Sequence, residues 1–213
     1  MEPTAPVLFL LGASHHTAPL AVREKLALDE TRAAGLAEQL RALPGMTEFT
    51  LLNTCNRVEI YGVARRPDTL PALRAAVAQT PGSAPAELEG VLRLRQNHEA
   101  IAHLFSVASG LDSQVVGETE ILGQVKAAYD AALARQWTGP VLNRVFQKTF
   151  QAAKHIRTHT GIGAGQVSTA TVAVDLAGRI FGELDTSQVL VVGAGEIGLK
   201  TAQAFQSRGA ASI

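Results

Sequence analysis

The chain has little of several residue types and no excess of charge. Its 213 residues include one cysteine, one tryptophan and two tyrosines. A single cysteine excludes an intramolecular disulfide framework and is typical of a reducing compartment. The 19 Lys and Arg residues equal the 19 Asp and Glu residues, which excludes a generally basic surface for nucleic acid. A local basic groove remains open.

Long hydrophobic runs are also missing. No apolar stretch approaches the ~18 residues that a membrane span needs. The N-terminal sequence MEPTAPVLFLLG has no basic leader and is unlike a signal peptide. Hydrophobic residues make up 46% of the chain, which is enough for a folded core. We therefore expect a cytoplasmic globular protein, without a membrane segment, built as one large or two small domains.

Strands and helices alternate in the first part of the chain. Val7–Gly12 is a short apolar run that predicts a buried strand. The stretch Glu48–Ala64 predicts two strands, separated by the polar quartet Asn53-Thr54-Cys55-Asn56. The order β-α-β-β-α-β indicates a ferredoxin-like sheet. The remaining predicted elements are helices over Leu20–Leu43 and Leu70–Gln79 and a strand near Val91–Leu94.

After Asn97 the pattern becomes helical, with apolar residues at i, i+3 and i+4. A β-branched run, Gln188–Val192, then leads into a glycine-rich motif and a last helix that ends near Arg208. This order predicts the start of a Rossmann-type unit, truncated after its first strand and helix. We assign residues 1–160 to a first domain and 161–213 to the partial nucleotide domain. The helices are predicted over His98–Ser109, Gly117–Trp137, Pro140–Thr158 and Ser168–Gly182.

The glycine-rich motif is a complete G-x-G-x-x-G. Its members are Gly193, Ala194, Gly195, Glu196, Ile197 and Gly198. A strand before it and a helix after it favour a dinucleotide site, because glycines let the backbone approach a pyrophosphate at a helix N-terminus. A tight turn without a ligand is the alternative. The residue that separates NADPH from NADH lies beyond residue 213, so the motif does not select between them.

Cys55 is the only thiol, and two interpretations are open for it. A lone cysteine is most often a small buried hydrophobe. Cys55, however, lies in a polar break between two apolar strands, beside Arg57. Loops between strands display reactive groups, and a nearby guanidinium favours the thiolate.

His103 lies on the predicted helix His98–Ser109, opposite the face formed by Ile101, Leu104, Phe105 and Ala108. An exposed histidine paired with Glu99 is one interpretation. A general acid or base that lines a cleft is the other. The polar pair Glu120 and Gln124 and the loop residues His15 and His16 favour no site by themselves. The basic stretch from Arg144 to Arg157 has two interpretations, a solvated helix face, which is the commoner, or a surface that faces RNA.

Taken together, these motifs resemble the glutamyl-tRNA reductase family. The matching segments occur in family order and cover nearly all of the chain. Two positions depart from the family pattern, since Thr119 replaces a usual proline and Glu120 an expected glutamine. The segments are GASHHTAPLAVREKL, NTCNRVEIY, HLFSVASGLDSQVVGETEILGQVKAAY, AAKHIRTHTGIGAGQVSTATVAVDLA and VLVVGAGEIG.

The resemblance implies an NADPH-dependent reduction of glutamyl-tRNA(Glu) to glutamate-1-semialdehyde, the first step towards 5-aminolevulinate and tetrapyrroles. Cys55 would attack the ester carbonyl and form a thioester, and Arg57 would recognise the glutamate carboxylate. His103 would protonate the leaving ribose oxygen, and Gly193–Gly198 would hold NADPH. The remaining substrate contacts implied are Thr54, Asn56, Ser113, Glu118, Thr119, Glu120 and Gln124.

The family further implies a homodimer formed through a C-terminal region and a partner, glutamate-1-semialdehyde aminomutase. We expect this chain to lack full reductase activity, since its nucleotide unit is truncated. Two alternatives remain: a thiol-dependent semialdehyde dehydrogenase, which shares the cysteine and the glycine-rich loop, and a non-catalytic dinucleotide-binding module. Neither explains the combination of the TCNR segment with the helical motifs.

Overall fold

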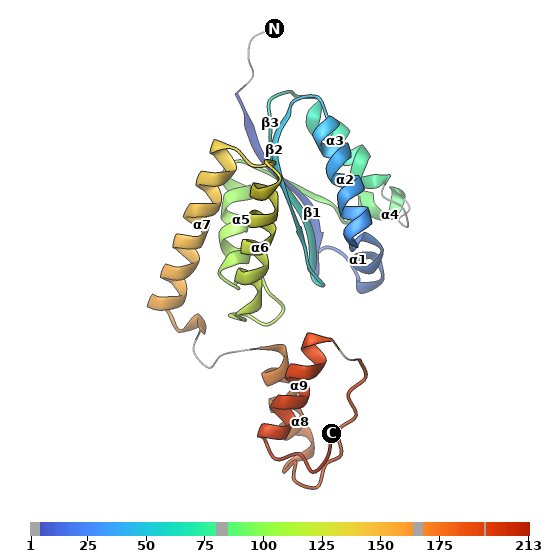
Figure 1. The fold of residues 1–213 in the computed structure, drawn as a ribbon, viewed down its shortest axis with the longest axis vertical. Coiled ribbons are helices and arrows are strands. Elements are labelled where there is room, and N and C mark those ends of the chain that lie inside the picture. Colours follow the sequence, from blue (N-terminus) through green and yellow to red (C-terminus); the bar gives the residue numbers. More distant parts are fainter. Residues whose placement is uncertain (1–4, 80–84, 164–167, 194) are drawn as a thin grey trace.

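Four antiparallel strands lie between two layers of helices in the computed structural model, which describes residues 5–79, 85–163, 168–193 and 195–213. Figure 1 shows one helical layer on each face of the sheet. The strands are β1 (Val7–Ser14), β2 (Met46–Asn53), β3 (Arg57–Ala64) and β4 (Arg93–Gln96). One layer contains α1 (Leu20–Leu26), α2 (Glu30–Ala42), α3 (Thr69–Ala78) and α4 (Pro85–Glu89); the other contains α5 (His98–Ala108), α6 (Glu120–Ala134) and α7 (Pro140–His159).

The strand order is β2-β3-β1-β4, and all neighbouring strands are antiparallel. This is the order of the split β-α-β arrangement, so the prediction of a ferredoxin-like sheet is confirmed. The central strand β1 is covered on both faces, because Phe9 and Leu11 pack towards α1–α4 while Leu8 and Leu10 pack towards α5–α7. Burial on both sides explains its continuous apolar sequence.

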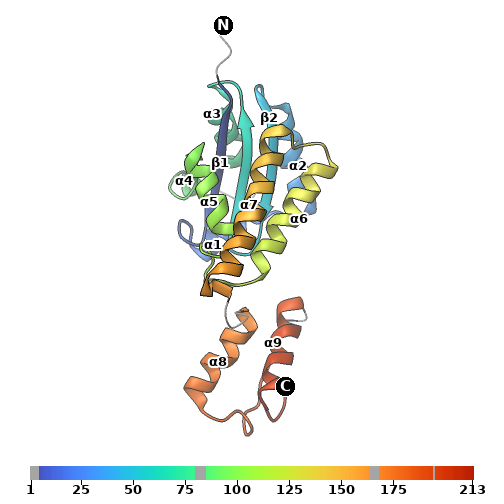
Figure 2. The ribbon, with the colours of Figure 1, turned by 90° about the vertical axis from the view of Figure 1, so that its left-hand side faces the viewer.

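Glu48 fixes the start of α7. Its buried carboxylate accepts hydrogen bonds from the backbone N–H groups of Gly139, Val141 and Leu142, at 2.7–3.2 Å. These groups have no partners within the helix, so a carboxylate from β2 satisfies them and complements the helix dipole. The contact attaches α7 to one end of the sheet, and Figure 2 shows α6 and α7 side by side over it.

The single helix predicted over Leu20–Leu43 is wrong, because α1 and α2 are separate helices. The chain turns at Ala27–Asp29, where the Asp29 side chain caps α2 by accepting the Arg32 N–H at 2.8 Å. The Asn53 amide side chain exchanges two hydrogen bonds with the Leu28 backbone. Capping and a long-range contact outweigh the helical periodicity there.

Most other predicted boundaries differ by only a few residues. β4 begins two residues later than the predicted strand, and α5 and α7 match their predictions within one residue. α6 begins at Glu120 rather than Gly117, because Gly117 has a φ of +84° that a continuing helix does not allow.

The last described part contains α8 (Thr169–Phe181) and α9 (Glu196–Ser207). Ser168, the first residue of the predicted helix, caps α8 by accepting the Thr171 N–H at 3.1 Å. The strand predicted over Gln188–Val192 is not formed in the described residues, where only one bridge joins Gln188 to Ser212. Leu190 and Val192 remain 87% and 90% exposed. A strand needs paired neighbours, and this run finds one contact.

Across the described ranges, no helix combines the length and apolar character needed to cross a bilayer.

Candidate active site

The single thiol lies in the loop that joins β2 to β3. The loop is short: the Thr54 N–H donates to the Arg57 carbonyl at 2.8 Å, and the Thr54 hydroxyl accepts from the N–H groups of Asn56 and Arg57. Cys55 is exposed at its tip. The buried-hydrophobe interpretation of Cys55 is therefore wrong, and its prediction as a displayed thiol agrees with the structure.

A guanidinium from α1 holds this loop in place. Arg23 donates from Nη1 to the Cys55 carbonyl and to the Asn56 side-chain oxygen, both at 2.9 Å. The His15 N–H donates to the Asn56 carbonyl at 2.9 Å. The loop is thus fixed from outside by α1 and by the residue that follows β1. Arg23, rather than Arg57, is the cation that contacts the Cys55 backbone.

Arg57 points into the protein instead of towards solvent, and only 2% of it is exposed. Its Nη1 donates to Glu59 Oε1 at 2.9 Å and to Asp112 Oδ2 at 3.1 Å, and Nη2 donates to the Asp112 carbonyl. Burial lowers the Arg57 pKa, but the charges of Glu59 and Asp112 outweigh it and raise that pKa overall. The guanidinium is therefore charged and already paired.

Glu59 lies at the centre of this buried cluster. It is 3% exposed and accepts hydrogen bonds from Arg57, from His103 Nε2 at 2.8 Å and from the Tyr61 hydroxyl at 2.7 Å. Burial raises the Glu59 pKa, but the His103 hydrogen bond and the Arg57 charge lower it overall. Burial, followed by the Glu59 charge, raises the Tyr61 pKa well above its ordinary value. Glu59 is thus ionised, and Tyr61 remains a neutral donor.

Gly12 of β1 makes room for Glu59. The two residues are direct partners across the β1–β3 pair. A Cβ atom at Gly12 would lie 2.4 Å from the Val58 carbonyl oxygen and 2.8 Å from Glu59 Cγ. Because Gly12 has no side chain, the Glu59 side chain has room to lie against β1 inside the core.

His103 is buried, and the interpretation as an exposed histidine paired with Glu99 is wrong. The buried stripe of α5 runs through Ala100, His103, Leu104 and Val107. The bulkier Ile101 and Phe105 turn instead towards α7. The sequence pattern therefore assigns the wrong phase to the helix, by about one residue. His103 Nδ1 lies 3.9 Å from Asp112 Oδ2.

Asp112 connects the cluster to the surface. Its side chain is 21% exposed, and Oδ1 lies 3.0 Å from His16 Nε2. His15 is stacked on His16, with ring centroids 3.9 Å apart. Burial, followed by the charges of His16 and Arg57, lowers the His15 pKa. A line of polar groups thus runs from Glu59 in the core to His16 outside.

Two of the predicted substrate residues contact each other below α5. The Ser113 hydroxyl donates to Glu118 Oε1 at 3.1 Å. The same carboxylate accepts the N–H groups of Glu120 and Ile121 and so caps α6. Arg157 of α7 donates to the carbonyls of Gly117 and Glu118. The side chains of Ser113 and Glu118 and the carbonyl groups of Gly117 and Glu118 are therefore already hydrogen-bonded within the protein.

The other predicted residues are more dispersed. Thr119 and Gln124 are exposed on and before α6. Glu120 forms an ion pair with Lys200 of α9 at 3.1 Å, which brings the helix after the glycine-rich motif to the start of α6. Ala194 lies outside the described residues. Gly193 and Gly195 precede α9, Gly195 is its N-cap, and Glu196, Ile197 and Gly198 are its first residues. Among the described residues, no hydrogen bond or ion pair joins them to Cys55 or His103.

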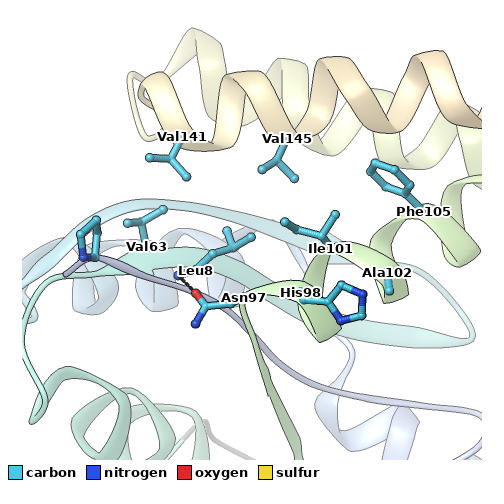
Figure 3. A pocket seen from close by; sticks show the side chains of 10 residues that line it. Leu8, Val63, Asn97, His98, Ile101, Ala102, Phe105, Val141 and Val145 are labelled. Atoms are coloured by element: carbon cyan, nitrogen blue, oxygen red, sulfur yellow. Dashed lines mark hydrogen bonds between the residues drawn. The ribbon is translucent and has the colours of Figure 1, made fainter.

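An apolar cavity of about 560 Å³ lies away from the thiol. Figure 3 shows its walls, to which Leu8, Val63, Ile101 and Val145 contribute. Val63 is six residues along β3 from Arg57, about 20 Å in an extended strand. Apart from Asn97 and His98, the residues that line this cavity have hydrocarbon side chains, and none of them carries a nucleophile for acyl transfer.

Sequence reasoning missed Glu59, Asp112, Arg23 and His16. One signal could have found Glu59: it follows Arg57 by two residues in a strand, so both side chains share one face. Two opposite charges on a face that must be covered by helices predict a buried pair. Asp112 and His16 come from loops, and no periodicity indicates that loops 96 residues apart meet.

The fold and the site define an α/β protein that has a ferredoxin-like sheet and displays one thiol at a hairpin beside a buried charged cluster. Residues 11–160 match the family described as glutamyl-tRNA(Glu) reductase, N-terminal domain. Because this match covers most of the chain, the chain belongs to the glutamyl-tRNA reductase family.

Individual relatives agree with this assignment. The chain is 40% identical over 203 residues to a glutamyl-tRNA reductase of Akkermansia muciniphila, covering 95% of this chain and 60% of the relative. It is 47% identical over 189 residues to that of Xanthomonas campestris pv. phaseoli, covering 89% and 43%. The solved glutamyl-tRNA reductase of Methanopyrus kandleri matches with a TM-score of 0.67 and 34% identity, covering 95% of this chain and 47% of that one. The chain spans about half the length of these relatives.

Proposed function

We propose that this chain carries the glutamyl-accepting site of a glutamyl-tRNA reductase, which converts glutamyl-tRNA(Glu) to glutamate-1-semialdehyde for tetrapyrrole synthesis. The observation that carries the proposal is the position of Cys55. Its thiol is exposed, while Arg23 and Thr54 fix the backbone on both sides of it. A nucleophile held in one position needs less reorganisation to attack a bound ester.

The proposed acyl transfer balances without a further reactant. Cys55 Sγ loses its proton and bonds to the carbonyl carbon of the glutamyl ester, the bond from that carbon to the ribose oxygen breaks, and the ribose oxygen takes up one proton. The thioester formed is more electrophilic than the ester and is ready for reduction. Because Nε2 of His103 donates its proton to Glu59, Nδ1 is the nitrogen that would take up the thiol proton and pass it to the ribose oxygen.

Arg57 would recognise the glutamate side-chain carboxylate by exchanging one partner. The Glu59 contact is deeply buried, whereas Asp112 is partly exposed. We propose that the substrate carboxylate takes the place of the Asp112 side chain on the guanidinium. Charge is conserved in this exchange, so the buried cation is never left without an anion.

The glycine-rich turn fits the pyrophosphate of NADPH. Gly193 has a φ of +117°, and a Cβ at Gly198 would lie 2.7 Å from the Gly193 carbonyl oxygen. These are the positions where a dinucleotide motif needs glycine, for the turn and for close packing of helix on strand. Gly193, Gly195 and the N-terminus of α9 would hold the phosphates, and Rossmann-type binding by residues 161–213 is part of this proposal. NADPH would supply the hydride that reduces the thioester.

The proposed partners follow from the same assignment. Residues 1–160 would act as the catalytic domain, and a homodimer would form through a region outside this chain. Glutamate-1-semialdehyde aminomutase would accept the product.

The test is covalent capture of radiolabelled glutamate from glutamyl-tRNA(Glu). The wild-type chain should acquire acid-stable, hydroxylamine-sensitive label, and Cys55→Ser should lose it by more than roughly 10³-fold, since an unactivated hydroxyl is a poor nucleophile. The matched control is wild-type protein alkylated with iodoacetamide, which modifies the only thiol and should behave like the variant. Near-native labelling of Cys55→Ser would refute the thioester route. Because Cys55 is exposed, the variant should unfold at the same denaturant concentration as the wild type.

A further inference from the structure

α7 has an unusual distribution of charge for a protein with no net charge. Its 20 residues contain Arg144, Lys148, Lys154 and Arg157 but no aspartate or glutamate. The exposed face carries the first three of these cations together with amide, hydroxyl and imidazole groups, since Gln151, His155 and Thr158 are exposed there. This exposed face therefore carries Lys and Arg residues but no Asp or Glu residue.

These cations are not used by the fold. Among the residues that the structure describes, Arg144, Lys148 and Lys154 form no ion pair with a carboxylate. Lys148 donates only to the neighbouring Gln151 side chain, at 3.1 Å. Arg157 differs, because it is half-buried and bonded to backbone carbonyls, and we leave it out of the surface.

A groove extends the cationic face to α6. It has a volume of about 400 Å³, and Lys126 and Lys154 stand on its two sides. Phe150 lies in its wall, with Lys126 Nζ 5.9 Å from the ring centroid. We name Lys126, Arg144, Lys148 and Lys154 the α7 basic face. The nearest acidic side chain on α6 is Asp130, one turn beyond Lys126.

The helix dipole does not account for this pattern. Cations are favoured in the last turn of a helix, which explains Arg157 and His159. Arg144 and Lys148 lie in the first half of α7, away from the last turn, so the dipole does not explain them.

The α7 basic face leads to the thiol end of the sheet. Arg157, near the end of α7, is bonded to Gly117 and Glu118, and the same loop contains Asp112, which is paired with Arg57. Arg57 follows Cys55 by two residues. Figure 1 shows the end of α7 and the β2–β3 hairpin at the same end of the helix–sheet layers. An elongated polyanion lying along α7 would therefore extend towards Cys55.

We propose that the α7 basic face binds the sugar–phosphate backbone of the acceptor stem of the tRNA, so that the charged 3′ end reaches Cys55. The inference rests on the proposed function for its choice of RNA. Lys148 and Lys154 are separated by a rise of about 9 Å along α7 and by about 120° around its axis, and Lys126 lies across the groove from Lys154. Cations spread over such an elongated surface suit successive phosphates rather than a single anion. Contacts with phosphates do not depend on the base sequence, but they set the orientation of the stem.

The experiment compares two triple variants of the full chain. Lys126→Gln/Lys148→Gln/Lys154→Gln removes three charges from the α7 basic face. Arg41→Gln/Arg66→Gln/Arg95→Gln removes three exposed charges elsewhere and is the matched control. Binding of uncharged tRNA(Glu) is measured by fluorescence anisotropy from about 50 to 200 mM KCl. Capture by Cys55 is measured separately with glutamyl-tRNA and with 2′(3′)-O-glutamyladenosine, which lacks phosphates.

The first variant should bind tRNA about tenfold or more weakly at 100 mM salt, and the slope of log K against log[salt] should fall by about 2–3. It should accept glutamate from glutamyladenosine at the wild-type rate, and the control should match the wild type throughout. Unchanged affinity and slope in the first variant, or equal losses in the control, would overturn the proposal. Binding to phosphatidylserine vesicles in place of tRNA would also overturn it. Failure of Cys55 to capture glutamate from either ester would instead refute the proposed function. The anisotropy measurements would still show whether the α7 basic face binds tRNA.

Discussion

The sheet region and the last described residues contain similar sequence signals but differ in how much structure these signals produce. Val7–Gly12 and Gln188–Val192 are both short apolar runs that end at a glycine. The first is paired on both edges and covered on both faces as part of β1, whereas the second forms one bridge and leaves its side chains exposed. An apolar run predicts a strand only where neighbouring elements can pair with it.

The two regions also differ in how they treat charge. The sheet region buries an ion pair, Arg57 with Glu59, within its core. In the last described residues, the ion pair between Arg208 and Asp175 lies at the surface, where both side chains are about half exposed. A buried pair is costly to break because the remaining charge has no solvent, while a surface pair is screened by water and salt. This difference can be measured.

The largest effect is expected for Glu59→Ala. The change leaves the His103 ring and the Tyr61 hydroxyl without their acceptor and leaves the buried Arg57 with Asp112 alone. The free energy of unfolding should therefore fall by about 3–5 kcal/mol. Asp175→Ala should cost less than about 1 kcal/mol. Urea unfolding followed by the fluorescence of Trp137, which lies in the sheet region, measures the loss caused by Glu59→Ala. Urea unfolding followed by circular dichroism measures the losses caused by both variants. Glu59→Gln keeps one acceptor oxygen and should lie between Glu59→Ala and wild type. Equal losses from Glu59→Ala and Asp175→Ala would show that the cluster does not stabilise the core.

The fold of the sheet region was largely predictable. Alternating strands and helices, with a polar break between two strands, specify the ferredoxin-like order because few topologies connect them. The break between α1 and α2 was not predictable from periodicity, since it depends on the side chain of Asn53, which is distant in sequence. The start of α7 likewise depends on Glu48, which lies 91 residues before Gly139.

The candidate site was predictable in part. A polar quartet between apolar strands indicates that Cys55 is displayed, and the structure agrees. The partners of Arg57 were not predictable, because Asp112 comes from a loop and the phase of α5 was assigned from large residues. Ile101 and Phe105 are the larger residues and so predict the buried face, yet the smaller Ala100 and Val107 lie deeper. Small residues are buried where helix and sheet approach most closely.

A second, smaller effect is expected at Gly12, where the core is tightest. Gly12→Ala places a methyl group against the Val58 carbonyl and the Glu59 side chain, and the backbone of two paired strands must move. We expect a loss of about 1–3 kcal/mol in the free energy of unfolding, typical of overpacking. Denaturant unfolding is again the measurement. A neutral Gly12→Ala would show that β1 and β3 move apart at this position without cost and that the close fit at Gly12 is dispensable.

The smallest effect is expected at Gly178, in the last turn of α8, and it has the opposite sign. A Cβ there meets nothing within 4 Å, so Gly178→Ala should stabilise α8 by about 0.5–1 kcal/mol through helix propensity. Gly35, in α2, is a matched position with equally open surroundings, and Gly35→Ala should give a similar gain. The readouts should differ, because only α2 packs on the sheet. Gly35→Ala should raise the free energy of global unfolding, whereas Gly178→Ala should raise the hydrogen-exchange protection of α8 amides and leave the unfolding of the sheet unchanged. If Gly178→Ala raised the free energy of global unfolding as much as Gly35→Ala does, the sheet region and the last residues would unfold as one unit. The two regions would then differ in packing but not in stability.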